Sequence, residues 1–247
     1  MSDDPFEKAA EEIVKRLPVE RIYTDAASGA VKELGHSLTD VAKTVRLVLF
    51  PLQVLGALQD RVAGFVDRAI RRVPEANRIS PAPQIVGPIL EGIRYEPEDT
   101  PIVEMFSELL SRSMDSDRVN EAHPSFPILI RQLSEDEAQI LASLRNQEYE
   151  HVHTQSFNPD THLFYGPSTI EIDELPRDKI RFSDNVPFYF QNLDKLGLAG
   201  IFQQGNQEPK FDQGPPRRQV GTRVRSKYRL TDFGRRFVQA CVGAGNG

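Results

Sequence analysis

The stretch PFYFQNLDKLGLAGIFQ, residues 187–203, decides how the C-terminal part of the chain folds. Its first part carries Phe188, Phe190, Leu193 and Leu196 at short spacings and reaches Gly197, a residue type that suits the position just past a helix. The uncharged residues that follow are typical of a strand. The stretch therefore predicts a helix over 187–198 that leads directly into a strand over 198–203.

The residues after this stretch predict a β-hairpin and a last helix. Residues 224–230 are the expected partner strand of residues 198–203, and a loop rich in Gly, Pro and Gln joins the two over about 204–224. Thr231-Asp232 then opens a helix over 233–242, because Thr and Asp side chains can accept hydrogen bonds from the first amides of a helix.

The residues before 187–203 predict one more helix and an insert. Ser134-Glu135-Asp136-Glu137 is a capping box, so a helix begins there. A polar insert over about 147–185 follows, with one expected strand at 169–172. Helix, insert, helix, hairpin and helix follow the order of a winged helix. We therefore expect a winged-helix-like module with a small β-hairpin over 134–247.

The chain before this module has the pattern of a helical body. Apolar residues recur at spacings of three and four over about 100–114, which predicts a helix. Six prolines between residues 74 and 101 separate shorter helices. The predicted fold class is mainly α (α+β), with a helical N-terminal body over 1–133 followed by the winged-helix-like C-terminal module.

Length and composition limit the classes of protein that the chain can belong to. With 247 residues, 39% of them hydrophobic, it can bury a core in one or two domains. It contains no run of eighteen apolar residues, so we expect no transmembrane span. The only cysteine, Cys241, cannot form an internal disulfide and fits a reducing compartment. We therefore expect a cytoplasmic protein.

Charge is distributed unevenly along the chain. Residues 1–200 carry 33 acidic and 21 basic side chains, a balance of −12, whereas residues 201–247 carry 3 acidic and 9 basic, a balance of +6. Six of these cations lie in the loop and second strand of the expected wing, a candidate polyanion-binding set: Arg217, Arg218, Arg223, Arg225, Lys227 and Arg229. The helix over 187–198 has only Lys195 as a cation, and we expect its aromatic residues in the core, so nucleic-acid binding is an alternative rather than the leading interpretation.

An apolar helix pattern lies around residues 44–66. The run LVLFPLQVLGAL, residues 47–58, is apolar nearly all round, which predicts burial on every side. A central core helix, a contact with another subunit and release into a lipid interface all satisfy that requirement. The candidate membrane or partner contacts are Leu47, Leu49, Phe50, Leu52, Leu55 and Leu58.

The sequence contains no recognised catalytic or cofactor motif. His151, His153 and His162 could in principle ligate a metal, but their spacing matches no metal-binding pattern known on helices. His123 precedes Pro124 at an expected helix start, which explains it structurally. We therefore expect no catalytic residues, no metal, no cofactor and no enzyme activity.

Several pieces, in order over about 200 residues, resemble the abortive-infection alpha family of bacterial proteins. They include Pro83-Gln84-Ile85-Val86-Gly87-Pro88, Met105-Phe106-Ser107-Glu108-Leu109-Leu110, Ala122-His123-Pro124-Ser125-Phe126 and Tyr228-Arg229-Leu230-Thr231-Asp232-Phe233-Gly234. This resemblance implies a role in phage exclusion, and it brings no catalytic residues with it.

The resemblance and the residues together favour a defence component that acts by binding or self-association. The expected partner is a protein, either a phage component or a co-encoded defence protein, and a homo-oligomer is a further expectation. The alternatives are a nucleic-acid-binding regulator that uses the winged module, and an effector that makes peripheral membrane contact through the apolar helix.

Overall fold

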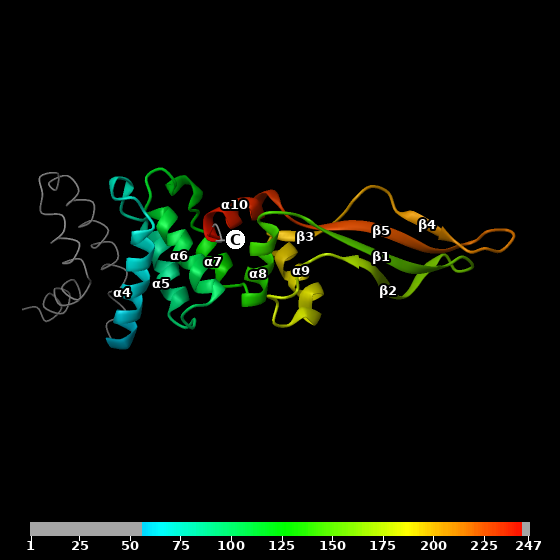
Figure 1. The fold of residues 1–247 in the computed structure, drawn as a ribbon, viewed down its shortest axis with the longest axis horizontal. Helices are drawn as coiled ribbons and strands as arrows, with labels where there is room; N and C mark the ends of the chain where they lie inside the picture. Colours follow the sequence, from blue (N-terminus) through cyan, green and yellow to red (C-terminus); the bar gives the residue numbers. More distant parts are fainter. Residues whose placement is uncertain (1–55, 244–247) are drawn as a thin grey trace, which may run out of the picture. The chain divides into compact units, whose positions relative to one another are not determined.

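The computed structural model describes residues 56–243 (Figure 1). The chain divides into two compact units, Met1–Leu133 with Gln239–Gly247 and Ser134–Val238. Within residues 56–243 there are seven α-helices and one five-stranded antiparallel sheet, which makes the fold α+β, as predicted. None of the helices in these residues is long and apolar enough to cross a membrane.

Helix α6 (Pro101–Ser113) is the centre of the first unit. Thr100 caps it by accepting a hydrogen bond of 3.2 Å from the amide of Val103, and Pro101 lies in the first turn, where no amide proton is needed. Its core residues include the fully buried Phe106, Leu109 and Leu110. The sequence predicted this helix because its apolar spacing and its cap are local signals.

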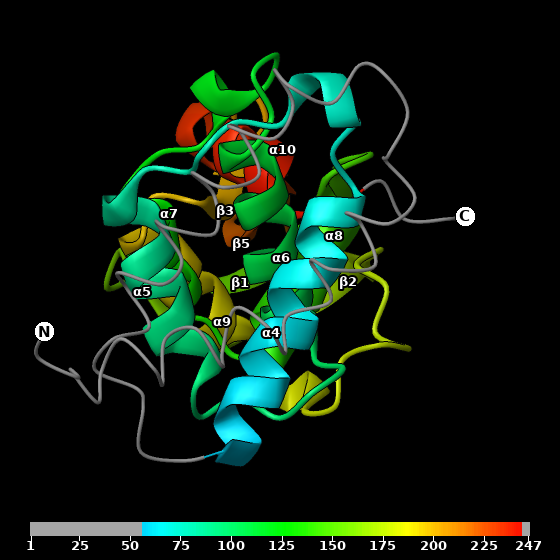
Figure 2. The same ribbon diagram turned by 90° about the vertical axis from the view of Figure 1, so that its left-hand side faces the viewer.

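Three further helices pack on α6 (Figure 2): α4 (Gly56–Arg71), α5 (Pro83–Ile93) and α7 (Phe126–Ile130). The contact with α5 is close because Gly92 has no side chain. A Cβ atom at Gly92 would lie 2.4 Å from Cζ of Phe106. Two short 3-10 helices complete the described part of this unit, η2 (Glu75–Asn77) and η3 (Val119–Glu121).

The second unit begins with the predicted capping box. Ser134 Oγ accepts a hydrogen bond from the Glu137 amide, and the Glu137 carboxylate accepts one of 2.7 Å from the Ser134 amide. The other helical elements of this part of the chain are α8 (Glu135–Leu144), η4 (Ser183–Asn185), α9 (Val186–Lys195) and α10 (Asp232–Cys241). Gly197 has a positive φ of 71° just after α9, the conformation that ends a helix and favours glycine.

A single antiparallel sheet forms the rest of the second unit. Its strands are β1 (Tyr149–Asn158), β2 (Leu163–Asp173), β3 (Ala199–Gln203), β4 (Glu208–Phe211) and β5 (Gln219–Leu230). The order is β2-β1-β5-β3, and β4 also pairs with β5 (Figure 1). The central strand β5 therefore has β1 along one edge and β3 and β4 in succession along the other.

The sheet is larger than the small hairpin that the sequence predicted. The polar insert over 147–185 forms β1 and β2 rather than one short strand at 169–172, and the loop over 204–224 contains β4 and the beginning of β5. β1 shows no alternation of apolar and polar residues, so its sequence lacks the periodic pattern of a half-buried strand. Its backbone is held instead by pairing with β5, which is distant in sequence.

Candidate functional site

The basic residues of β5 lie on one face of the sheet. Because side chains alternate along a strand, Arg223, Arg225, Lys227 and Arg229 share a face. In the register with β1, Arg223 lies opposite Thr154 and Lys227 opposite Glu150. We call this the charged face.

Glu171 of β2 is the point at which four strands meet on the charged face. Its carboxylate accepts hydrogen bonds of 2.6 Å from Arg223 Nε on β5, 2.5 Å from Lys210 Nζ on β4 and 2.5 Å from Thr154 Oγ1 on β1. These bonds, that from Arg223 foremost, lower the pKa of Glu171 from its ordinary 4.5 to about 2. We call these four residues the Glu171 cluster.

Carboxylates engage other cations of the predicted polyanion-binding set. Arg225 lies 3.3 Å from Glu208 of β4, and Lys227 lies 3.1 Å from Glu148. Two more members of the set are engaged in other places: Arg218 pairs with Asp160 at 3.4 Å, and Arg229 stacks over the Phe202 ring at 4.3 Å.

The charged face is consequently a mixed surface of both signs. Arg217 is exposed in the loop before β5. Exposed ion pairs contribute little to stability, but each carboxylate offsets the positive charge that its cation would offer to a phosphate. The sequence could not show this, because the acidic partners come from β1, β2 and β4 rather than from the basic run itself.

Exposed apolar side chains form a second feature of the sheet. Seven large hydrophobic residues of the sheet are at least 40% exposed; one is Ile201 of β3, and six lie on β2, β4 and β5: Leu163, Phe164, Tyr165, Ile170, Phe211 and Val220. Four of the six lie within the run Thr161–Ile170, which contains no Asp, Glu, Lys or Arg. We call these six residues the apolar fringe. Exposed apolar groups concentrated on one element are typical of binding surfaces, and the polar composition of the insert concealed this one.

The buried carboxylate of Asp136 fixes the segment before α9. It accepts hydrogen bonds of 2.7 Å and 3.0 Å from the amides of Arg181 and Phe182, and one of 2.8 Å from the Tyr189 hydroxyl. Burial would raise the pKa of Asp136, but these three donors outweigh burial and lower it.

Phe190 of α9 is buried as expected, whereas Phe188 is 65% exposed, so the prediction that both belong to the core was wrong for Phe188.

The three histidines of the insert do not converge. His151 Nδ1 lies 3.0 Å from the Tyr228 hydroxyl, and its ring is 5.6 Å from that of His153. Burial lowers the pKa of His151, against the opposing effect of Asp173. His162 lies instead in the turn after β1, against the Phe157 ring. Among the described residues no group of three or more His, Cys, Asp or Glu side chains could hold a metal ion.

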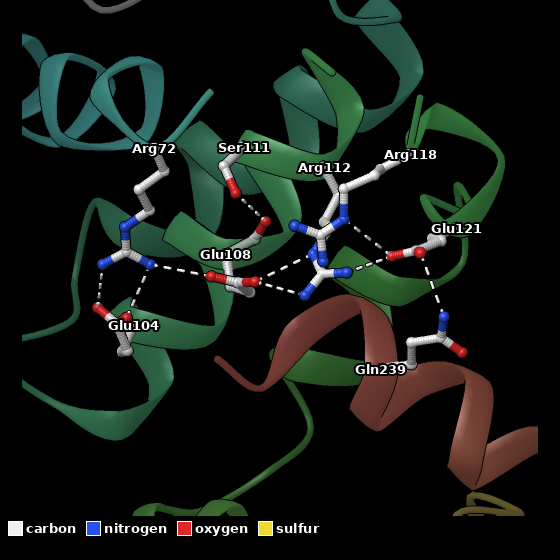
Figure 3. Close-up of polar contacts among 8 residues, drawn as sticks. All are labelled: Arg72, Glu104, Glu108, Ser111, Arg112, Arg118, Glu121 and Gln239. Carbon is white, nitrogen blue, oxygen red and sulfur yellow. Dashed lines mark hydrogen bonds and ion pairs between the residues drawn. The ribbon is translucent and has the colours of Figure 1, made fainter. Parts of the chain in front are cut away.

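An ion-pair network crosses the first unit (Figure 3). Arg112 on α6, whose side chain is 5% exposed, contacts Glu108 at 2.6 Å and also binds Glu121 of η3. Glu108 in turn lies 3.1 Å from Arg72, which follows α4. At the other end, the Gln239 amide donates a hydrogen bond of 3.1 Å to Glu121.

The network balances its charges. Arg72 also lies 2.8 Å from Glu104, whose hydrogen bond raises the pKa of Arg72, and Arg118 lies 3.6 Å from Glu121. Three arginines therefore face three glutamates, and these groups satisfy one another. The spacing of four between Glu104, Glu108 and Arg112 was visible in the sequence. The contacts that Arg72, Glu121 and Gln239 make with this network were not visible in the sequence, because these residues come from distant segments.

The predicted apolar contact residues fall almost entirely outside the described chain. Leu47, Leu49, Phe50, Leu52 and Leu55 precede residue 56, and Leu58 lies in α4 at a position whose side chain is not described. The choice between core helix, subunit contact and lipid contact therefore stays a prediction.

Comparison with known proteins gives one result. The sequence profile of the family described as abortive infection alpha matches residues 53–241, which is most of the chain. No curated protein and no solved structure matches the chain.

Proposed function

Because the chain belongs to the abortive infection alpha family, we propose that it is a component of antiphage defence that acts by binding, and that the sheet of its second unit is the binding surface. The family supports the setting. The apolar fringe supports action by binding, because its six exposed apolar side chains would be removed from water in contact with a partner.

The polar clusters of the described residues favour binding over catalysis. In the Glu171 cluster the carboxylate is saturated by three donors, and Asp136 is likewise occupied by three. General acids and bases need a proton that can leave or arrive near neutral pH. Glu171, with a pKa near 2, is fixed in its charged form. Glu171 therefore holds strands together, and Asp136 holds the segment before α9 in place.

The setting is tested by phage challenge. Bacterial cells that express the full chain are infected with a panel of phages, and plaque formation is compared with that on cells carrying the empty vector. Fewer plaques for at least one phage is the expected result. Equal plaque counts across the panel would remove antiphage defence as the proposed function.

A second candidate is nucleic-acid binding through a winged helix. The arrangement that favours it is α8 before β1, α9 before β3, and β5 lying between β1 and β3 in the sheet. The loop between β4 and β5, which carries Arg217 and Arg218, would then be the wing. The pairing of Arg223, Arg225 and Lys227 with carboxylates is the argument against this candidate.

The two candidates differ in their dependence on salt. Binding to phosphates releases counterions, so affinity for duplex DNA falls steeply as salt rises. If the chain binds DNA, the double variant Arg217→Glu and Arg218→Glu weakens binding and flattens the salt dependence. Undetectable or salt-insensitive binding of the wild type removes this candidate and leaves the first.

A further inference from the structure

The outer edge of β2 has no strand beside it among the described residues. β2 is eleven residues long and is the terminal strand of the order β2-β1-β5-β3. A free edge presents unpaired amide and carbonyl groups, to which another strand can add. Natural edges are commonly protected by charged side chains, by proline or by a bulge, and the run Thr161–Ile170 along this edge contains no Asp, Glu, Lys or Arg. It does contain Pro167, next to a bulge.

Both faces of this edge strand carry exposed apolar side chains. Phe164 lies opposite Phe157 and Ile170 opposite His153, and because Phe157 and His153 are four apart on β1, Phe164 and Ile170 share a face. Tyr165, opposite Ser156, lies on the other face together with Leu163. The side chains of Phe164 and Ile170 are 49% and 58% exposed on the first face, and those of Tyr165 and Leu163 are 57% and 65% exposed on the second.

Apolar groups on both faces of a free edge favour strand addition over other contacts. A flat protein surface would cover only one face of β2. A lipid phase could contact both faces, but it would leave the edge amides and carbonyls without partners, which is costly in hydrocarbon. An added strand supplies side-chain neighbours on both faces and hydrogen bonds to the edge.

The charge pattern points to a second copy of this chain as the source of that strand. In a twofold contact each strand meets its own sequence, so charges near the axis would oppose like charges. The run Thr161–Ile170 avoids this because it contains no Asp, Glu, Lys or Arg. The flanking carboxylates are neutralised within the chain, Asp160 by Arg218 and Glu171 by Arg223 and Lys210.

We propose that β2 pairs antiparallel with β2 of a second copy to form a twofold dimer. This inference rests on the proposed function and names self-association as one of its binding events. We place the twofold axis at the larger irregularity of β2, between Tyr165 and Thr169, where Gly166 has a φ of 71°; a smaller one lies between Ile170 and Ile172. Placing the bulges of both copies at the axis sets Phe164 opposite Ile170 of the partner subunit, and Ile170 opposite Phe164 of the partner subunit.

The contact area predicts a dimer that dissociates on dilution. A half-exposed aromatic or large aliphatic side chain offers about 100 Å² for burial. The four fringe residues of β2 on two copies therefore contribute about 800 Å², to which the paired backbone adds. Specific interfaces begin at about 1,000 Å² of total area. This interface lies at that lower limit, so we expect the population of dimer to depend on concentration in the micromolar range.

Sedimentation analysis of the full chain over a concentration series tests the pairing. The wild type is expected to shift from monomer to dimer, and the double variant Phe164→Lys and Ile170→Lys to stay monomeric at every concentration, because four lysines would meet at the axis. Val220→Lys is the matched control, since Val220 is also an exposed apolar residue of the sheet but lies on β5. It should dimerise like the wild type. Circular dichroism establishes that each variant is folded.

A disulfide test checks the register. The native Cys241 is buried, and burial raises the pKa of its thiol well above the ordinary value, so it should not react. A mixture of a Phe164→Cys chain with an Ile170→Cys chain should form a disulfide-linked pair under mild oxidation. Either variant alone should not, because Phe164 and Ile170 lie opposite β1 residues that are four apart, so its two cysteines would be about 13 Å from each other along the strands.

Three outcomes overturn the proposal: a wild type that stays monomeric, a lysine variant that dimerises as well as the wild type, and cysteine variants that cross-link equally alone and mixed. A monomeric wild type that still protects cells from phage would overturn the dimer alone and leave binding to another partner as the function. A wild type that dimerises but gives no protection would overturn the proposed function alone.

Discussion

Arg223 Nε donates a hydrogen bond of 2.6 Å to the carboxylate of Glu171, a residue 52 positions earlier in the chain. Lys210 and Thr154 donate to the same carboxylate, so one side chain of β2 joins β1, β4 and β5. The basic run of β5 thereby has a structural use: part of it holds β2 in the sheet. This arrangement keeps the apolar fringe of β2 in a fixed place.

Glu171→Gln should loosen β2 without unfolding the unit. The amide carries no charge to pair with Arg223 and Lys210, and it replaces one acceptor oxygen with an NH2 group that can only donate. Hydrogen exchange followed by mass spectrometry is expected to show several-fold faster exchange in peptides from β2, with exchange in α8 unchanged. Glu174→Gln is the control, because Glu174 accepts only a backbone amide. Unchanged exchange in β2 would mean that the Glu171 cluster does not hold the strand.

The pH dependence of the same cluster follows from the lowered pKa. A carboxylate whose pKa is lower in the folded than in the unfolded state stabilises the fold above the unfolded value, and this contribution is lost as pH falls through the folded value. For Glu171 the pKa is 4.5 in the unfolded state and about 2 in the folded state. Protection of β2 amides should therefore be highest above about pH 4.5 and decline towards pH 2. The Gln variant should show a smaller decline, since Asp136 of the same unit, whose pKa is also lowered, is still present.

Asp136→Ala should destabilise the second unit strongly. It leaves the amides of Arg181 and Phe182 and the Tyr189 hydroxyl without their acceptor, and hydrogen bonds to a charged group each contribute about 1.5–3 kcal/mol. We expect a loss of about 3 kcal/mol or more in the free energy of unfolding, measured by urea denaturation. Asp136→Asn retains one carbonyl acceptor and should lose less. Equal losses in the two variants would contradict the role given to these bonds.

Arg112→Met tests the ion-pair network of the first unit. The substitution leaves Glu108 and Glu121 without their shared buried partner, and breaking one side of a buried ion pair costs about 3–5 kcal/mol. Arg118→Met removes the more exposed arginine at the end of the network and should cost less than about 1 kcal/mol. Urea unfolding of both variants gives the comparison. Similar midpoints for the two would show that the network does not stabilise the unit.

Sequence reasoning succeeded where the signals were local. The capping box at Ser134 and the passage from helix to strand at Gly197 depend on residues within a few positions of one another, and both are present. It failed where pairing came from distant segments. β1 is a strand because β5 lies beside it, and the acidic partners of Arg223 and Arg225 lie on other strands. The candidate binding surface was therefore expected to be basic, whereas it is mixed in charge with an apolar fringe.

Plaque formation on cells that express sheet variants which stay folded tests whether the chain acts by binding through β2. Phe164→Lys with Ile170→Lys alters the apolar fringe of β2 while leaving the Glu171 cluster and the helices intact. Compared at equal protein level with the wild type and with the exposed α10 variant Arg236→Glu, the β2 variant should lose protection against any phage that the wild type restricts, while the α10 variant keeps it. Full protection by a folded β2 variant would contradict the claim that the chain acts by binding through this strand.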